Sequence, residues 1–399
     1  MKRLSSFFFL LSLLLSACAP ASQTPEEQQA IEPVATAEES QAAPQSATAS
    51  EEPPLPLEPN AALIDTPAII NIEMLDEVNG WAVTEENIIR TNDGGVTWYD
   101  VTPGNFADAG YLIYPEFFSA RWAWVQFPDM NNYPNGGTLY RTSDGGTTWE
   151  SFVTPFSGGI FHFIDEENGW MMADLGVGAG SMAVSIFQTS DGGETWNRVY
   201  TNDPNIEGAG ESLPLGGIKG TLLPLDAQTM WVGGVVYAPG TVYLFRSEDG
   251  GETWTQIKLS LPTDAAESEL SVEDIRFVSS THGVIKLRIT SDTPQVVLYA
   301  TEDGGNTWSR LPTIFEGAGY LDIPSASEMI FYTGDQFHVT TDAGLTFTTI
   351  TPDVKFGDSV IDISFANSTT GWVVTFNESN KRILYKTTDG GVSWTALTQ

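Results

Sequence analysis

A short motif recurs seven times along the chain, and its spacing limits the possible folds more than any other feature of the sequence. The motif reads Thr/Ser-x-Asp-x-Gly-x-Thr/Ser-Trp, and one weaker copy, at residues 340–347, ends in phenylalanine. Its aspartates follow one another at intervals of 39 to 58 residues and are Asp93, Asp144, Asp191, Asp249, Asp303, Asp342 and Asp389. Intervals of this size are typical of one four-stranded blade of a β-propeller.

Each position of the motif suits a tight turn. The carboxylate can accept hydrogen bonds from backbone N–H groups of its own turn, and glycine supplies the positive φ that the turn requires. The tryptophan can fill the space beneath it. A calcium loop would need several carboxylates at alternating positions, whereas the seven copies share only one. We therefore expect these aspartates to be structural, and we expect no bound metal and no cofactor.

Short runs of β-branched and aromatic residues surround the motifs. Before the last copy stand the runs 361–365, 371–376 and 383–387, and residues 394–398 follow it. Such runs, separated by turn residues, indicate four strands for each motif. Seven such groups occupy residues 62–399. The sequence therefore predicts an all-β fold, a single seven-bladed β-propeller of four-stranded antiparallel blades.

The motifs resemble those of Asp-box proteins, also called bacterial neuraminidase repeat (BNR) proteins. A Gly-Trp pair lies some twenty residues before several copies, at Gly80-Trp81, Gly169-Trp170 and Gly371-Trp372. With this pair the chain is similar to the photosystem II assembly and stability factor family and its relatives among bacterial lipoproteins. The resemblance implies a propeller that binds or assembles other proteins without catalysing a reaction. Sialidases and xyloglucanases carry the same motifs, so a glycoside hydrolase is the alternative.

One departure from that family concerns positive charge. The family is understood to use a basic patch on its propeller. In this chain the residues that precede the seven motifs differ in type and are Arg90, Arg141, Gln188, Arg246, Ala300, Val339 and Lys386. We therefore expect a client other than the photosystem.

The N-terminus has the pattern of a bacterial lipoprotein signal. Two basic residues precede an apolar run, and residues 15–18 read Leu-Ser-Ala-Cys, which resembles the lipobox. Cys18 is the only cysteine, so it has no partner for an internal disulfide. The resemblance implies that Cys18 carries a lipid and becomes the first residue of the mature protein. This feature predicts a chain anchored to the extracytoplasmic face of a membrane in the cell envelope.

The segment after the signal differs sharply in composition from the rest of the chain. We expect residues 1–17 to be the signal peptide and residues 18–61 to be a disordered acidic tether, rich in proline and alanine. With few large apolar side chains, such a segment cannot offset the entropy lost on folding. The propeller would then comprise residues 62–399.

Acidic residues dominate the charge of the protein. The formal net charge is -35, and loss of Lys2 and Arg3 with the signal lowers it to -37. A surface this acidic repels nucleic acid, so the expected client is a protein or a carbohydrate.

Three aspartates offer the sharpest hint of a site. A comparison of the first strands places Asp274, Asp322 and Asp362 in the same register in the fifth, sixth and seventh predicted blades, where the first blade has Asn71. Adjacent blades would bring the three carboxylates together near the mouth of a central channel. Such a cluster binds a cation or raises a pKa for acid–base chemistry. The alternative is that each carboxylate bonds the backbone of the neighbouring blade.

Irregular loops and aromatic residues point to the same region. The motif turns share one face. The longer loops, at residues 127–137, 175–181, 202–217 and 262–271, decorate the opposite face, where binding is usual on a rigid scaffold. In or beside the loop at residues 127–137, Phe127 and Tyr133 are the aromatic residues expected to be exposed there. Residues of a catalytic constellation are not signalled, because His162, His282 and His338 fall at different strand positions.

Overall fold

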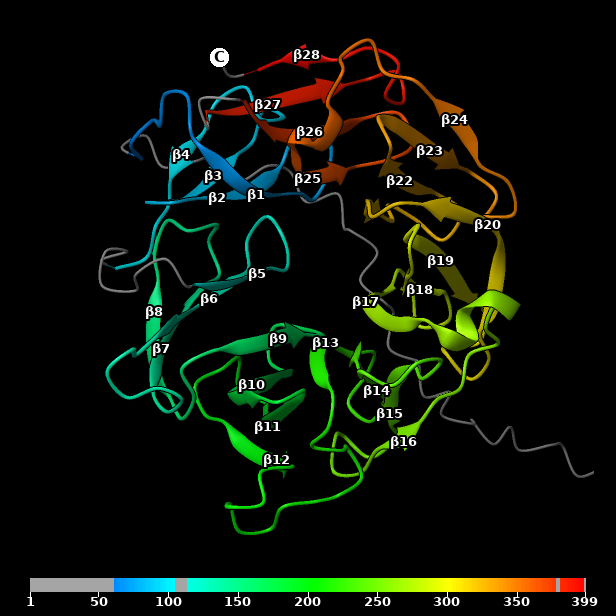
Figure 1. Cartoon of the computed structure of the whole chain (residues 1–399). Coiled ribbons are helices and arrows are strands. Elements are labelled where there is room, and N and C mark those ends of the chain that lie inside the picture. The colour runs from blue at the N-terminus through cyan, green and yellow to red at the C-terminus, as the bar shows by residue number, and fades with distance from the viewer. Residues whose placement is uncertain (1–60, 105–112, 378–380, 398–399) are drawn as a thin grey trace, which may run out of the picture. The chain divides into compact units, whose positions relative to one another are not determined.

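The computed structural model describes residues 61–104, 113–377 and 381–397 and shows an all-β chain (Figure 1). A unit of residues 1–44 lies outside the described residues, and the remaining unit comprises residues 45–399. The prediction of an all-β fold built from four-stranded antiparallel sheets is confirmed, with five separate sheets of this kind and one larger sheet. Among the described residues, no helix has the length and apolar character needed to cross a membrane.

The strands follow the chain in groups of four. The first sheet holds β1 (Ile69–Met74), β2 (Gly80–Thr84), β3 (Ile88–Thr91) and β4 (Tyr99–Asp100). The second holds β5 (Tyr114–Phe117), β6 (Ala123–Pro128), β7 (Gly137–Thr142) and β8 (Glu150–Thr154). The third holds β9 (Gly159–Phe163), β10 (Gly169–Gly178), β11 (Ser181–Thr189) and β12 (Asn197–Thr201).

The larger sheet contains two such groups. One holds β13 (Ile218–Pro224), β14 (Met230–Val235), β15 (Tyr243–Ser247) and β16 (Thr255–Gln256). The other holds β17 (Glu269–Phe277), β18 (Gly283–Thr290), β19 (Gln295–Thr301) and β20 (Ser309–Glu316). A single residue pair, Val235 and Ser271, joins β14 to β17.

Two further sheets complete the order. One holds β21 (Tyr320–Asp322), β22 (Met329–Thr333), β23 (Gln336–Thr340) and β24 (Thr348–Ile350). The last holds β25 (Val360–Phe365), β26 (Gly371–Phe376), β27 (Arg382–Thr387) and β28 (Thr395–Ala396). The short 3-10 helices η1 (Thr263–Glu267) and η2 (Gly357–Ser359) precede β17 and β25.

The first strand of each group lies nearest a common centre, as the labels of β1, β5, β9, β13, β17 and β25 show in Figure 1. Contacts between β1 and β25 join the first group to the last. The second strands carry consecutive apolar residues and are buried along their length, as in β2 and β6. Such strands are buried on both faces because each sheet packs against a neighbour on either side.

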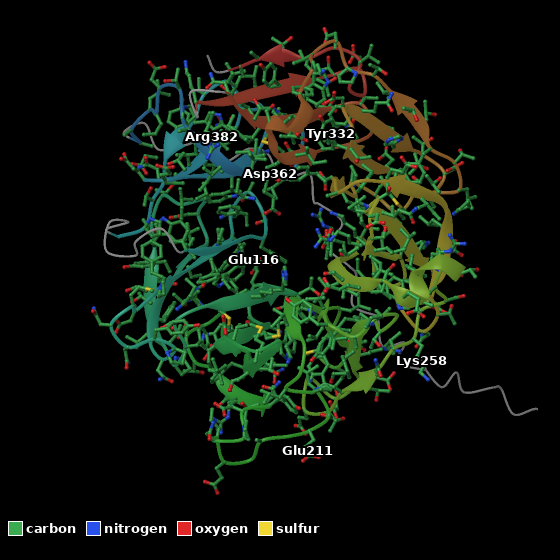
Figure 2. All side chains as sticks on the ribbon, in the orientation of Figure 1. Glu116, Glu211, Lys258, Tyr332, Asp362 and Arg382 are labelled. Atoms are coloured by element: carbon green, nitrogen blue, oxygen red, sulfur yellow. The ribbon has the colours of Figure 1, made fainter. Side chains whose placement is uncertain are left out.

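The core lies in the seams, by which we mean the packing between one group of four strands and the next (Figure 2). Aromatic stacking recurs there. The Trp124 ring lies 3.8 Å from the Phe163 ring at an interplanar angle of 6°, and Trp81 stacks on Phe117 at 5.1 Å. Across the junction of the two ends, the Trp372 indole N–H donates to the Gly94 carbonyl at 2.9 Å.

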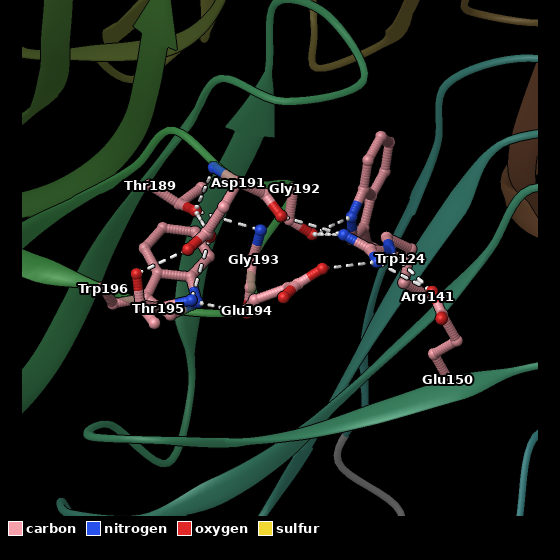
Figure 3. Close-up of polar contacts among 10 residues, drawn as sticks. All are labelled: Trp124, Arg141, Glu150, Thr189, Asp191, Gly192, Gly193, Glu194, Thr195 and Trp196. Atoms are coloured by element: carbon pink, nitrogen blue, oxygen red, sulfur yellow. Dashed lines mark hydrogen bonds and ion pairs between the residues drawn. The ribbon is translucent and has the colours of Figure 1, made fainter.

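Each repeated motif forms the turn between the third and fourth strands of its group. The carboxylate accepts one hydrogen bond from the hydroxyl two residues before it and two from the residue four positions after it, through its N–H and its hydroxyl. In the turn shown in Figure 3, Asp191 accepts from the Thr189 hydroxyl at 2.8 Å and from the Thr195 N–H and hydroxyl at 2.9 and 2.6 Å. Gly192 and Gly193 have φ of +70° and +93°, which an L side chain rarely adopts.

Removal of one such carboxylate should cost measurable stability. Partial burial opposes the charged form of Asp191, but its hydrogen bonds outweigh this effect and lower its pKa. We expect Asp191→Ala to lower the free energy of unfolding at neutral pH by about 1–2 kcal/mol, because three hydrogen bonds to an exposed charged group are lost. Since the folded pKa is depressed, the difference should vanish as the pH falls through it.

Urea unfolding at pH 7 and at low pH measures this difference. Asp292→Ala, which removes an exposed carboxylate between β18 and β19, is the matched control and should change little. An equal effect of both substitutions would contradict the stabilising role of Asp191.

One of the predicted loops differs from the structure. Residues 175–181 were expected to be irregular, yet β10 and β11 continue as a hairpin to Gly178 and Ser181, with a register shift between Asp174 and Gly176. The glycines suggested a loop, but backbone pairing accommodates them through this bulge. Residues 202–217 do connect two groups without a strand, as expected.

Candidate functional site

Charged side chains from several first strands converge at the centre of the described region. One position recurs in these strands, directly opposite the second residue of the following strand. It is filled by Glu73, Glu116, His162, Leu223, Arg276, Asp322 and Ser364. We call these seven residues the inner ring. Figure 2 shows Glu116 and Asp362 on the inner side of the strands that carry them.

The predicted common register of the three aspartates is wrong for Asp322. Asp274 and Asp362 pair with Lys286 and Val374, each three residues after the start of the next strand. Asp322 pairs with Ile330, one residue after the start of β22, so it belongs to the inner ring. The sequence comparison was offset by two residues. Since side chains alternate with a period of two, that offset left the predicted face unchanged.

Asp362 bonds the neighbouring sheet. It accepts hydrogen bonds from the Ile72 N–H at 2.8 Å and from the Asn71 side-chain amide at 2.9 Å, both on β1. Burial raises the pKa of Asp362 to about 6, while its backbone hydrogen bonds oppose the shift. For Asp362 the contacts match the alternative interpretation of the sequence, in which the carboxylate bonds the backbone of the neighbouring group of strands.

Asp322 has the same kind of contact. Its carboxylate accepts from the Phe365 N–H of β25 at 2.6 Å, and it also accepts from Arg276 at 2.9 Å. Burial raises the pKa of Asp322 against the opposing effect of the Arg276 charge. Both aspartates therefore hold adjacent first strands together.

Arg276 balances the charge of the aspartates. Its guanidinium lies 2.8 Å from Asp274 and 2.9 Å from Asp322, and the two carboxylates raise its pKa although burial opposes this. Within the described residues, no group of three or more His, Cys, Asp or Glu residues is arranged to hold a metal ion. The predicted cluster is thus an arginine-centred ion pair in which Asp362 takes no part.

On the other side of the inner ring lies a hollow of about 540 Å³. Glu73, Glu116 and His162 line it together with apolar residues of β1, β2 and β5. The His162 Nδ1 lies 3.0 Å from the Glu116 carboxylate. Burial opposes the charged imidazole, but Glu116 outweighs this and raises the pKa of His162.

Glu73 is an acid of the inner ring whose pKa is strongly raised. Solvent reaches its side chain from the hollow, yet protein atoms surround it closely. Desolvation, followed by the charge of Glu116, raises its pKa to about 8, although Arg276 acts in the opposite direction. Glu73 therefore can hold a proton at neutral pH and donate it to a ligand in the hollow.

This shift predicts a dependence of stability on pH. The folded state binds the Glu73 proton more tightly than the unfolded state, so stability is lost as the pH rises from the unfolded pKa toward about 8. Glu73→Gln should raise the free energy of unfolding at pH 9 by about 1 kcal/mol, a value discounted for solvent access, and leave it unchanged at pH 4.

Urea unfolding of the wild type and of Glu73→Gln at both pH values measures this effect. Glu211→Gln, which alters an exposed carboxylate between β12 and β13, is the control. A gain of equal size at pH 4 and pH 9 would contradict the raised pKa.

The two aromatic candidates differ in exposure. Phe127 was expected to be exposed, but it is buried in the seam and its ring lies 4.9 Å from that of Tyr140. It falls within β6 and not in the loop, and its strand position directs it into the core. Tyr133 is 46% exposed, and its hydroxyl donates to the Asp174 carbonyl at 3.3 Å. Cys18 and the predicted tether lie outside the described residues.

Sequence reasoning missed four members of the inner ring, namely Glu73, Glu116, His162 and Arg276. These four residues share one position, because each pairs with the second residue of the following strand. That second residue is often the tryptophan of the Gly-Trp pair, which can be recognised in the sequence. Alignment of the first strands from this tryptophan would have found Glu73, Glu116 and His162. It would not have found Arg276 or placed Asp322, because Val284 and Ile330 occupy the tryptophan position in those two groups.

Comparisons with known proteins bear on the fold. No family model and no curated protein matches the sequence. The crystal structure of the GH74 xyloglucanase from Xanthomonas campestris matches with a TM-score of 0.52 at 14% identity, over 85% of this chain and 55% of that chain. This chain thus spans about half the length of the xyloglucanase.

Two other solved structures match with lower TM-scores. YCF48 bound to D1 peptide has a TM-score of 0.48 and 16% identity, over 83% of this chain and 98% of that chain. A polysaccharide lyase of family PL25, an ulvan lyase, has a TM-score of 0.48 and 13% identity, over 85% of this chain and 96% of that chain. These likenesses concern the fold alone. With the repeated four-stranded sheets, the xyloglucanase match establishes a β-propeller.

Proposed function

We propose that this protein is a non-enzymatic binding scaffold, a seven-bladed Asp-box propeller that Cys18 anchors to the extracytoplasmic face of a membrane in the bacterial cell envelope. The proposal rests mainly on the contacts that the three predicted aspartates make. Asp322 and Asp362 bond the backbone of the next sheet, and Asp274 pairs with Arg276. Carboxylates engaged in this way stabilise a rigid frame and are poorly suited to nucleophilic attack.

The inner ring is the proposed contact with the client. It offers a hollow with both apolar and polar walls. A pocket with convergent polar groups on apolar walls is typical of a ligand site. Because the chain as a whole is strongly acidic, we infer that the client presents a basic segment.

Glycoside hydrolysis is the second candidate, and one observation favours it. Glu73 has a pKa of about 8, and the charge of the nearby Glu116 contributes to that shift. A protonated acid beside a second carboxylate is the pairing that glycosidases use. Under this alternative Glu73 would be the general acid, in place of the aspartates first considered.

Capture from membranes tests the main proposal. The full chain with its lipid anchor should retain a client from solubilised membranes of the source bacterium, and added salt should release it. The double variant Glu73→Gln/Glu116→Gln should lose the client, whereas Glu211→Gln should retain it. Retention by the double variant would exclude the inner ring as the contact.

Incubation with a panel of polysaccharides and sialosides tests the alternative. The proposal expects no release of sugar by the wild type. If the wild type releases sugar and Glu73→Gln does not, the protein is a hydrolase and the scaffold proposal is wrong.

A further inference from the structure

A second hollow lies in one seam, at the end of the sheets that carries the motif turns. Its interpretation begins with the other seams. At five of them the residue after the start of the second strand is a tryptophan, namely Trp81, Trp124, Trp170, Trp231 and Trp372. Each of these residues faces a long polar residue on the third strand, namely Arg90, Arg141, Gln188, Arg246 and Lys386.

These pairs fill the seam in a consistent way. The Arg90 guanidinium lies over the Trp81 ring at 5.6 Å, and the Lys386 ammonium lies over the Trp372 ring at 4.6 Å. Three of the five pairs place a cation over the indole ring, with Arg246 over Trp231 as the third, whereas Gln188 opposite Trp170 carries no charge. At four of these five seams the indole or the cation donates to a carbonyl of the next motif turn, as Arg90 does to Gly145.

The seam between β17–β20 and β21–β24 lacks this filling. The corresponding pair there is Val284 opposite Ala300, and the stacking partner on the next first strand is replaced by Ile323. Three small aliphatic residues thus stand where Trp81, Arg90 and Phe117 meet in the first seam. They line a hollow of about 560 Å³.

The walls of this hollow are largely apolar and its rim is acidic. Leu311, Met329 and Leu345 contribute further apolar surface, and Glu302 and Asp303 stand among the lining residues. A volume of this size is typical of pockets for small molecules. Since residue 300 is alanine, the pocket contains no counterpart of the arginine or lysine present at the corresponding position of four other seams.

One backbone acceptor in the pocket is left open. Ala343 occupies the motif position of Gly145, whose carbonyl accepts from Arg90, and of Gly192, whose carbonyl accepts from the Trp124 indole. Across the described part of the chain, no donor reaches the Ala343 carbonyl. A bound molecule with an N–H group can therefore form the hydrogen bond that the protein itself supplies at other seams.

We propose that this pocket binds a small planar aromatic molecule that carries an N–H donor and a positive charge. Such a molecule reproduces the indole and the cation that four of the other seams contain. Its ring packs on Val284, Leu311 and Ile323, its N–H donates to Ala343, and its charge faces Glu302. The pocket is separate from the inner ring, so this binding does not depend on the proposed scaffold function.

Calorimetric titration of the full chain with tryptamine, indole and indole-3-acetate tests the proposal. Tryptamine should bind saturably, indole more weakly, and the acetate least, because its carboxylate meets an acidic rim. Absence of saturable binding by tryptamine would overturn the proposal. Equal affinity for tryptamine and indole-3-acetate would overturn the assignment of a cationic ligand.

Two variants connect binding to the pocket. Val284→Trp places the missing indole in the seam and should weaken tryptamine at least tenfold, whereas Val78→Trp, at an exposed turn, should leave affinity unchanged. Ala300→Arg fills the pocket from the other strand and serves if Val284→Trp does not fold, as thermal unfolding will show. If either variant folds and still binds tryptamine with the affinity of the wild type, the tryptamine site lies outside this pocket.

Discussion

Trp124→Ala should be the most destabilising of the substitutions considered, with a loss of about 4 kcal/mol in the free energy of unfolding. The Trp124 side chain is fully buried, and its ring stacks on Phe163 across the seam. Replacement of a buried tryptophan by alanine typically costs 3–5 kcal/mol, from lost transfer free energy and from the cavity that remains. The aromatic stack adds to the loss.

The hydrogen bond of the indole contributes less. Its N–H donates to the Gly192 carbonyl at 2.9 Å, but the Arg141 guanidinium donates to the same oxygen at 3.2 Å (Figure 3). The carbonyl therefore keeps a partner in the variant, which limits the penalty for an unsatisfied group. Most of the predicted loss comes from packing.

Urea unfolding at neutral pH measures the difference. Trp122→Ala is the control, since Trp122 is only partly buried and lies against Trp124 at 5.9 Å. We expect less than half the effect there. A loss below about 1.5 kcal/mol for Trp124→Ala would show that the seam relaxes to fill the cavity.

The fold could be predicted because local chemistry repeats. Each motif specifies a turn through one carboxylate and its glycines, and each turn joins a third strand to a fourth. The strand groups follow from the apolar runs between the turns. The length of the β10–β11 hairpin and the bridge between β14 and β17 were not predictable, because both depend on backbone pairing that side-chain patterns do not encode.

The site was predicted only in part, for a different reason. The comparison of first strands placed Asp322 in the register of Asp362, whereas strand pairing places it two residues away. Period-two alternation kept Asp322 on the central face. The partnership with Arg276 escaped notice because it spans two sheets and 46 residues of sequence.

The pocket beside Val284 can be traced to a tryptophan that other groups of strands have and this group lacks. Residue 284 stands where five other groups have tryptophan, and Ala300 was already distinct among the residues that precede the motifs. Taken separately, each difference is an ordinary variation in a repeat. The pairing of β18 with β19 places residues 284 and 300 opposite each other, and their small side chains together leave the space that forms the pocket.

Arg276→Met should lower the free energy of unfolding at pH 7.5 by about 2–3 kcal/mol. The guanidinium pairs with Asp274 and Asp322, whose side chains are 28% and 16% exposed. Removal of one partner leaves carboxylates that are poorly solvated and close together. For a fully buried pair the cost is 3–5 kcal/mol, and the 44% exposure of the Arg276 side chain reduces it here.

The pH dependence of this loss separates charge from packing. Without the guanidinium the pKa of Asp322 should rise further, because burial already raises it and Arg276 is the main opposing charge. The folded variant therefore binds protons at a higher pH than the folded wild type does. Its loss in the free energy of unfolding is present at neutral pH and becomes smaller as the carboxylates are protonated at lower pH.

Urea unfolding at pH 7.5 and pH 3.5 provides the measurement. Arg276→Lys is the control, because it keeps the charge while losing the two-sided geometry of the guanidinium, and it should recover part of the stability at pH 7.5. If Arg276→Met were equally destabilised at both pH values, the loss would come from side-chain packing. The inner ring would then not be held together by charge.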